Sequence, residues 1–221
     1  MTFSILARDP ASGEVGGAAA TGSLCVGGWV LRADPRAGAS ASQGAAPSTF
    51  WGEDVLVRMR AGEAAAQALS AVTGSDAGRE HRQLAAIGLD GATGHFTGAA
   101  NTPAMGARVA PGVVVTGNLL TGEAVLDAAL EAFRAAPGAL PDRLLAALEA
   151  GARAGGDKRG LQSAALLVVG PAAPPLTLRI DWSENPLADL ARLRARAARP
   201  PYADWLSSVP VLTDRERPGP E

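Results

Sequence analysis

The start of the chain alternates between apolar and polar positions in a way that predicts an antiparallel hairpin. Over residues 2–8, the apolar residues that share one face of a strand are Phe3, Ile5 and Ala7. Turn-forming residues occupy 9–13, and the glycine- and alanine-rich segment 15–23 predicts a second strand that a neighbouring layer approaches closely. This hairpin is expected to hold Thr2 at the end of a sheet rather than on a loose tail.

The pattern then predicts blocks of strands separated by blocks of helices. Further strands are expected near 38–43 and over 82–89, 93–97, 112–117, 162–169 and 176–182. Helices are expected over 54–72 (as two short helices broken at 61–62), 122–136, 140–154 and 186–199. Because strands and helices do not alternate strictly, an α+β fold is predicted. Residues 1–199 form a single domain in this interpretation, and 200–221 a proline-rich C-terminal tail.

Composition limits the class of protein. Of the 221 residues, 47% are hydrophobic but only 4% are aromatic, so the core must consist mainly of alanine, valine and leucine. The formal net charge of −2 gives no electrostatic basis for binding nucleic acid or an anionic membrane. One cysteine excludes an internal disulfide, and neither a signal peptide nor a membrane-spanning segment is evident. We therefore expect a cytoplasmic protein, with a homodimer as a reasonable default.

The sequence lacks the motifs of several common classes of enzyme. No two glycines are spaced as a dinucleotide-binding fingerprint requires, and no P-loop pattern occurs. His81, His95 and Cys25 do not make a usual zinc site, and the elbow around the serine of a Ser-His-Asp triad is missing. No metal and no cofactor are expected.

Thr2 is a candidate nucleophile because it directly follows the initiator methionine. Methionine is normally removed before a small residue, and the mature chain would then begin with a threonine that carries a free α-amine. The pKa of such an amine, about 7.7–8.0, allows it to take the proton from its own hydroxyl near neutral pH. Many unrelated proteins also begin with Met-Thr, so the position alone leaves the assignment open.

Two further segments concentrate polar side chains beside predicted strands. Residues 155–165 read Gly-Gly-Asp-Lys-Arg-Gly-Leu-Gln-Ser-Ala-Ala, between a helix and a buried strand. Asp157 and Arg159 could belong to a site there, or could simply pair and cap the turn. Asn118 follows the 112–117 strand, where its amide could donate to an oxyanion or serve as an ordinary turn residue.

Together these segments resemble one family, the bacterial DUF1028 proteins, over about residues 2–195. The similar segments, in the family's order, are 1–9, Gln43, 82–84, 97–98, 117–120 and 155–165, of which the last is the most specific. DUF1028 proteins are grouped with N-terminal-nucleophile (Ntn) hydrolases. The resemblance therefore implies a four-layer αββα sandwich of Ntn-hydrolase type with mainly antiparallel sheets.

The resemblance also implies an amidohydrolase that cleaves a small or peptide-like amide through an acyl-enzyme intermediate. The implied catalytic positions are Thr2, Asn118 and Asp157, and the implied substrate-binding positions are Ser23, Gln43 and Arg159. In this interpretation the amine of Thr2 is the base and Asp157 orients the reacting groups. Arg159 would bind a substrate carboxylate through two parallel hydrogen bonds.

The chain also departs from the family pattern near these positions. Leu24 stands where members often have lysine, Ala46 stands where an asparagine precedes the proline, and 99–106 lacks an expected tryptophan. These differences favour a second hypothesis, a catalytically inactive binding protein that keeps the Ntn fold.

Overall fold

The computed structural model describes residues 2–219. Residue 1, whose removal the predicted mechanism requires, lies outside the described residues, as do residues 220–221 at the end of the predicted tail. No helix in the described part of the chain is long and apolar enough to cross a bilayer.

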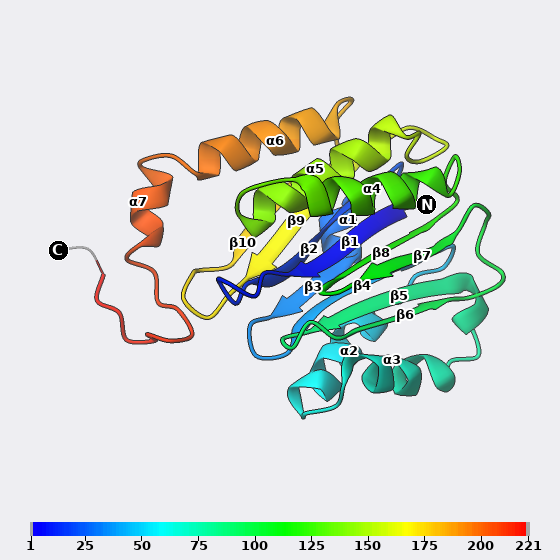
Figure 1. Cartoon of the computed structure of the whole chain (residues 1–221), viewed down its shortest axis with the longest axis horizontal. Helices are drawn as coiled ribbons and strands as arrows, with labels where there is room; N and C mark the ends of the chain where they lie inside the picture. Colours follow the sequence, from blue (N-terminus) through cyan, green and yellow to red (C-terminus); the bar gives the residue numbers. More distant parts are fainter. Residues whose placement is uncertain (1, 220–221) are drawn as a thin grey trace.

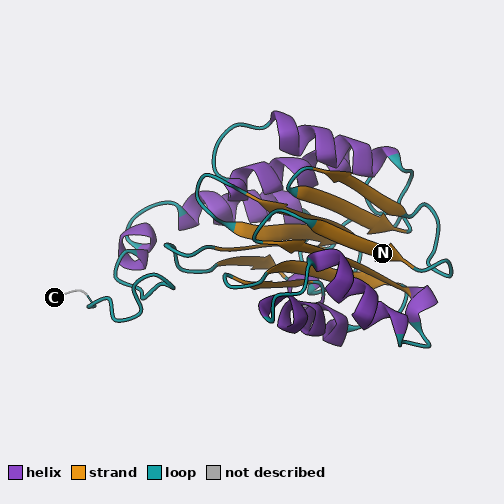
Figure 2. Cartoon of the chain, turned by 60° about the horizontal axis from the view of Figure 1, so that its bottom comes forward, coloured by secondary structure: helices purple, strands orange, loops and turns teal. Residues whose placement is uncertain are grey.

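Two antiparallel sheets make up the centre of the molecule (Figures 1 and 2). The six-stranded sheet has the order β10 (Leu176–Ile180), β9 (Ser163–Val169), β2 (Val15–Thr21), β1 (Thr2–Arg8), β8 (Val113–Asn118) and β7 (Gly106–Ala110). The four-stranded sheet has the order β3 (Leu31–Asp34), β4 (Gly38–Gly44), β5 (Arg82–Gly88) and β6 (Thr93–Thr97). The predicted hairpin is confirmed, because β1 pairs with β2 antiparallel along its whole length.

Helices cover the outer face of each sheet. Three helices pack on the six-stranded sheet: α4 (Ala124–Ala135), α5 (Leu140–Arg153) and α6 (Pro186–Ala197). Two pack on the four-stranded sheet: α2 (Thr49–Arg60) and α3 (Ala65–Gly74). Figure 1 shows β1 (dark blue) beneath α4 and α5, with β4 and β5 on its other side. The predicted α+β class is confirmed.

The alternation along β1 determines which layer each residue enters. Phe3 and Ile5 are fully buried in the cluster formed with α4 and α5, whereas Leu6 belongs to the cluster between the two sheets. A third cluster lies between the four-stranded sheet and its helices. Alternate residues of a strand point to the same face of the sheet, so the side chains of Thr2 and Ser4, like that of Leu6, point into the layer between the sheets.

Five short elements were not predicted, and several predicted boundaries were wrong by two to five residues. The elements are α1 (Val26–Trp29), β3, the 3-10 helix Arg79–His81, β7 and α7 (Tyr202–Leu206). β3 and β7 are edge strands of four and five residues, too short for a clear period of two. The helix predicted to begin at residue 54 begins at Thr49, and β2 ends at Thr21, so Ser23 lies in the following loop.

Close contact between α5 and β1 depends on a glycine. A Cβ at Gly151 would lie 2.8 Å from Cε2 of Phe3, a ring that is fully buried beside Thr2. Any larger residue at this point of α5 must displace the ring or the helix.

The substitution Gly151→Ala is therefore expected to lower the free energy of unfolding by about 1–3 kcal/mol through overpacking. Gly74→Ala is the matched control, because Gly74 ends α3 and has nothing within 4 Å of its Cβ position. Urea unfolding followed by circular dichroism measures both. Equal stability of the Gly151→Ala variant and the native chain would contradict this account of the α5–β1 contact.

Candidate functional site

Thr2 begins the central strand of the larger sheet. It lies opposite Thr21 of β2 and Asn118 of β8, so strands on both sides fix its backbone. Its side chain points between the sheets, where its hydroxyl donates a hydrogen bond of 3.2 Å to Oγ1 of Thr21. The residue is 7% exposed. The sequence-predicted nucleophile therefore has a fixed position at the sheet end.

A cavity of about 660 Å³ opens beside Thr2. Its lining residues are Thr2, Thr21, Ser23, Leu24, Val26, Trp29, Val30, Gln43, Gly44, Ala45, Pro47, Thr102, Leu119 and Arg159. The structure thus brings four of the six predicted site residues, from four separate segments, to one cavity. Its volume falls within the range of small-molecule sites.

Asp157 lies behind the cavity wall and holds two of its segments together. Its buried carboxylate accepts the N–H of Gly22 at 2.5 Å and that of Arg159 at 2.8 Å, and it pairs with Nη2 of Arg159 at 3.1 Å. A Cβ at Gly22 would lie 2.5 Å from the carbonyl oxygen of Gly160, so only glycine allows this approach. Asp157 therefore joins the end of β2 to the 155–161 loop.

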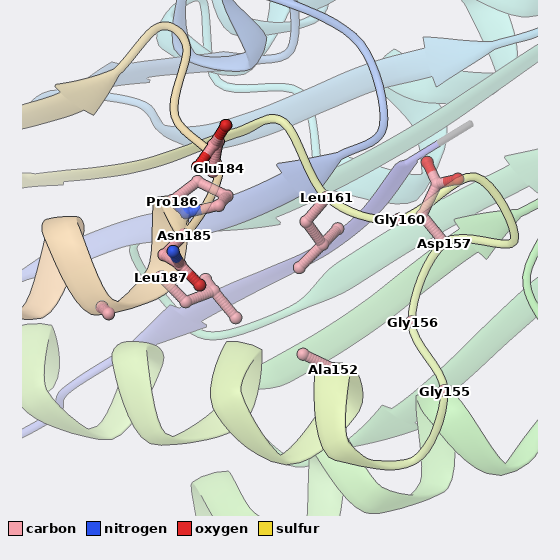
Figure 3. Close-up of a pocket in the computed structure, with 11 residues that line it drawn as sticks. Ala152, Gly155, Gly156, Asp157, Gly160, Leu161, Glu184, Asn185, Pro186 and Leu187 are labelled. Carbon is pink, nitrogen blue, oxygen red and sulfur yellow. The ribbon is translucent and has the colours of Figure 1, made fainter.

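The opposite side of that loop borders a different cavity, of about 320 Å³ (Figure 3). This second cavity lies between the end of α5 and the start of α6. In Figure 3 the carboxylate of Asp157 is turned away from Ala152 and Leu187, which form the far walls. The carboxylate of Asp157 contacts Gly22 and Arg159, and Arg159 lines the cavity beside Thr2.

A row of buried amides runs between the sheets beside Thr2. Nε2 of Gln43 donates to Oε1 of Gln83 at 2.7 Å and lies 3.4 Å from the carbonyl oxygen of Thr2. Nδ2 of Asn118 donates to the same Gln83 oxygen at 3.2 Å, and Nε2 of Gln83 donates to the carbonyl of Gly117 at 2.9 Å. Gln83 therefore joins the two sheets at the level of the candidate nucleophile.

Two of the predicted site residues do not line the cavity. Asn118 is buried in the amide row, where its side-chain amide contacts Gln83. Asp157 contacts the lining residue Arg159 and the backbone of Gly22, which stands between the lining residues Thr21 and Ser23. Both act through neighbouring residues in this arrangement.

Sequence reasoning assigned no role to Gln83, Thr21, Leu24 or Trp29. Gln83 could have been noticed, because it is a polar residue within a strand of otherwise buried apolar residues. Leu24 stood out only as the position where family members often have lysine. Thr21 and Trp29 carried no comparable signal, and the approach of α1 to the cavity depends on the fold.

The cavity wall contains strained backbone. Leu119, which lines the cavity, has a φ of 56°, and Cys25, between two lining residues, has a φ of 59°. Among the described residues these are the non-glycine positions with positive φ. Strain of this kind persists where the surrounding structure enforces it and is concentrated at functional sites.

The 98–102 loop completes the wall next to Gly44 and Ala45. Oδ1 of Asn101 accepts the N–H of Ala45 at 2.9 Å, and Nδ2 of Asn101 donates to the carbonyls of Arg82 and Gly98. Glu80 holds the same loop by accepting the N–H of Ala99 at 2.8 Å. This hydrogen bond lowers the pKa of the Glu80 carboxyl below its ordinary value.

Comparison with known proteins identifies the family. A family model described as a family of unknown function, DUF1028, matches residues 2–190. The chain belongs to the DUF1028 family. A crystal structure of the protein SPO2555 from Silicibacter pomeroyi, also assigned to DUF1028, is 52% identical in sequence. The two structures superpose with a TM-score of 0.95, over 99% of each chain. No curated protein matches this DUF1028 chain.

The amide row yields a stability prediction. In the substitution Gln83→Leu, the amides of Gln43 and Asn118 lose their shared acceptor inside the protein. We expect a loss of about 1–3 kcal/mol in unfolding free energy for each buried partner left without a hydrogen bond. Chemical denaturation measures the change, and Gln67→Leu, at an exposed position of α3, is the control. If both variants unfolded at the same denaturant concentration, the amide row would have no role in joining the sheets.

Proposed function

We propose that this DUF1028 protein is an Ntn-type amidohydrolase and that Thr2 is its nucleophile once Met1 is removed. The observation that carries the proposal is the position of Thr2: a hydroxyl at the first described residue of the central strand, lining a cavity of small-molecule size. The stacking of two antiparallel sheets between helices supports an assignment to the four-layer αββα sandwich of Ntn hydrolases.

The proposed reaction uses groups of Thr2 itself. The neutral α-amine takes the proton of the Thr2 hydroxyl, and Oγ1 attacks the carbonyl carbon of the amide. When the tetrahedral intermediate collapses, the C–N bond breaks and the leaving amine takes a proton from the α-ammonium group. Water then attacks the acyl-Thr2 ester, which releases the carboxylic acid and restores the hydroxyl. Water has then added across the amide bond, and no cofactor is required.

The surroundings of Thr2 suit this role in two respects. Among the described residues that line the cavity there is no histidine, so the α-amine of Thr2 is the candidate general base for the Thr2 hydroxyl. Gln43 contacts the Thr2 carbonyl, and the Thr2–Thr21 hydrogen bond holds the hydroxyl on the cavity side. A reacting group held in one geometry gains much of its rate from that positioning.

Thr2→Ala is expected to reduce amide hydrolysis by about 10³-fold or more, since the nucleophile is lost, whereas Thr2→Ser should retain measurable activity. Steady-state assays on a panel of small amides, with product detection by mass spectrometry, measure the effect. Thr177→Ala, at an exposed position of β10, is the control and should leave the rate unchanged.

The N-terminus itself provides a second test. The intact mass should correspond to a chain that begins at Thr2, and an acylating probe should modify the N-terminal peptide of the native chain but not of Thr2→Ala. Full retention of Met1 in an active preparation would exclude this mechanism. Failure of the probe to label a correctly processed chain would favour an inactive binding protein.

A further inference from the structure

The cavity beside Thr2 is lined by a cationic side chain. Of the side chains that line it in the described structure, Arg159 is the one that is charged, and no carboxylate lines the cavity. The guanidinium side chain is 43% exposed, so it reaches the cavity although its partner Asp157 is fully buried. Asp157 offsets part of the Arg159 charge, but the exposed guanidinium can still donate hydrogen bonds to an anionic group of a ligand, whereas no carboxylate among the described lining residues is there to pair with a cationic group.

A second Asp-x-Arg turn in the same chain shows what is particular to Arg159. Arg36 pairs with Asp34 through the same atoms, with its N–H 2.9 Å and its Nε 3.0 Å from Oδ1 of the aspartate. The Arg36 side chain is equally exposed, at 41%. However, the Asp34 turn follows β3 at a distance from the Thr2 cavity, whereas the Asp157 turn is bound to Gly22 at its edge. The same local motif thus presents a guanidinium to the cavity at one position only.

Another part of the cavity wall is apolar and exposed. Leu24 and Trp29 are 53% and 54% exposed, in a chain with few aromatic residues. Their segment is held in place, because the N–H of Cys25 donates to the carbonyl of Asp181 and that of Val26 to Oγ of Ser163. A fixed, exposed apolar surface in a cavity is typical of a ligand-binding site.

These features identify a substrate class, on the basis of the proposed function. We propose that the cavity takes amides of the N-acyl amino acid type, which carry one free carboxylate and one apolar or aromatic group. The carboxylate contacts the exposed part of the Arg159 guanidinium, whose Nε and Nη2 also pair with Asp157, and the apolar group packs on Leu24 and Trp29. Hydrolysis adds water across the amide C–N bond and gives a carboxylic acid and a free amino acid.

Binding to the Thr2→Ala variant tests this assignment without requiring catalysis. The probes are N-phenylacetylglycine, its neutral carboxamide N-phenylacetylglycinamide, and the cationic amide formed from phenylacetic acid and ethylenediamine. By calorimetry, the acid is expected to bind about tenfold more tightly than the carboxamide, and the cationic amide more weakly than either. Equal affinities for all three probes, or no binding of the acid, would overturn the assignment.

Variants in the Thr2→Ala background locate the preference. Arg159→Gln should remove the preference for the acid, Arg159→Lys should keep part of it, and the control Arg36→Gln should keep all of it. Trp29→Ala should weaken the binding of the acid and of the carboxamide by the same factor, about tenfold, because both probes carry the phenyl group. If Arg159→Gln kept the full preference for the acid, the proposed role of Arg159 would be overturned. If the glutamine variant does not fold, Arg159→Lys tests the same role.

Hydrolysis by the native chain separates the two proposals. If the Thr2→Ala variant binds the acid preferentially but the native chain cleaves none of the probes, N-acyl amino acids are ligands of the cavity and the amidohydrolase mechanism is wrong. If the native chain cleaves the acid and the carboxamide with equal kcat/KM, the mechanism stands and the role of Arg159 fails.

Discussion

The buried carboxylate of Asp157 fixes the geometry on which the rest of the site depends. It accepts the N–H of Gly22 at the end of β2 and pairs with Arg159 in the loop after α5, so it joins segments that are far apart in sequence. Removing a carboxylate from water is costly unless its oxygens are hydrogen-bonded and its charge is paired, and here both conditions are met. The same contacts place Arg159 beside Thr21, the β2 residue opposite Thr2. The contacts of Asp157 therefore determine where Arg159 lies relative to Thr2, the candidate nucleophile.

A second constraint is the small size of the residues in the sheets. β2 consists of valine, threonine, glycine and alanine, and a Cβ at Gly17 would lie 3.4 Å from Cδ2 of Leu31 in β3 of the other sheet. Layers that approach so closely leave little space for aromatic rings. Trp29, Trp182 and Trp205 are accordingly exposed, whereas Trp51 is buried beneath the smaller sheet. Of these three, Trp29 lines the cavity beside Thr2.

Between the sheets, polar residues replace part of the apolar core. Gln43, Gln83 and Asn118 form hydrogen bonds to one another where the strands β4, β5 and β8 meet near Thr2. Oε1 of Gln43 is buried and has no hydrogen-bond partner within the described residues, at a side chain that lines the cavity. Unsatisfied buried polar atoms are uncommon and are concentrated at functional sites. This amide row and the strained residues Cys25 and Leu119 mark the same end of the sheets as Thr2 does.

The sequence by itself determined the hairpin, most of the strands and helices, and the α+β class, because these depend on local periodicity and turn chemistry. It also indicated Thr2 and the 155–165 run, since unusual polar residues beside an apolar strand are visible without a structure. Only the tertiary structure decided that Asp157 lies behind the cavity, that Asn118 is buried in the amide row, and that Leu24 and Trp29 form a wall. Those placements arise from contacts between segments that are distant in sequence, 35 residues apart for Gln83 with Asn118 and 135 for Gly22 with Asp157, and no local pattern encodes such contacts.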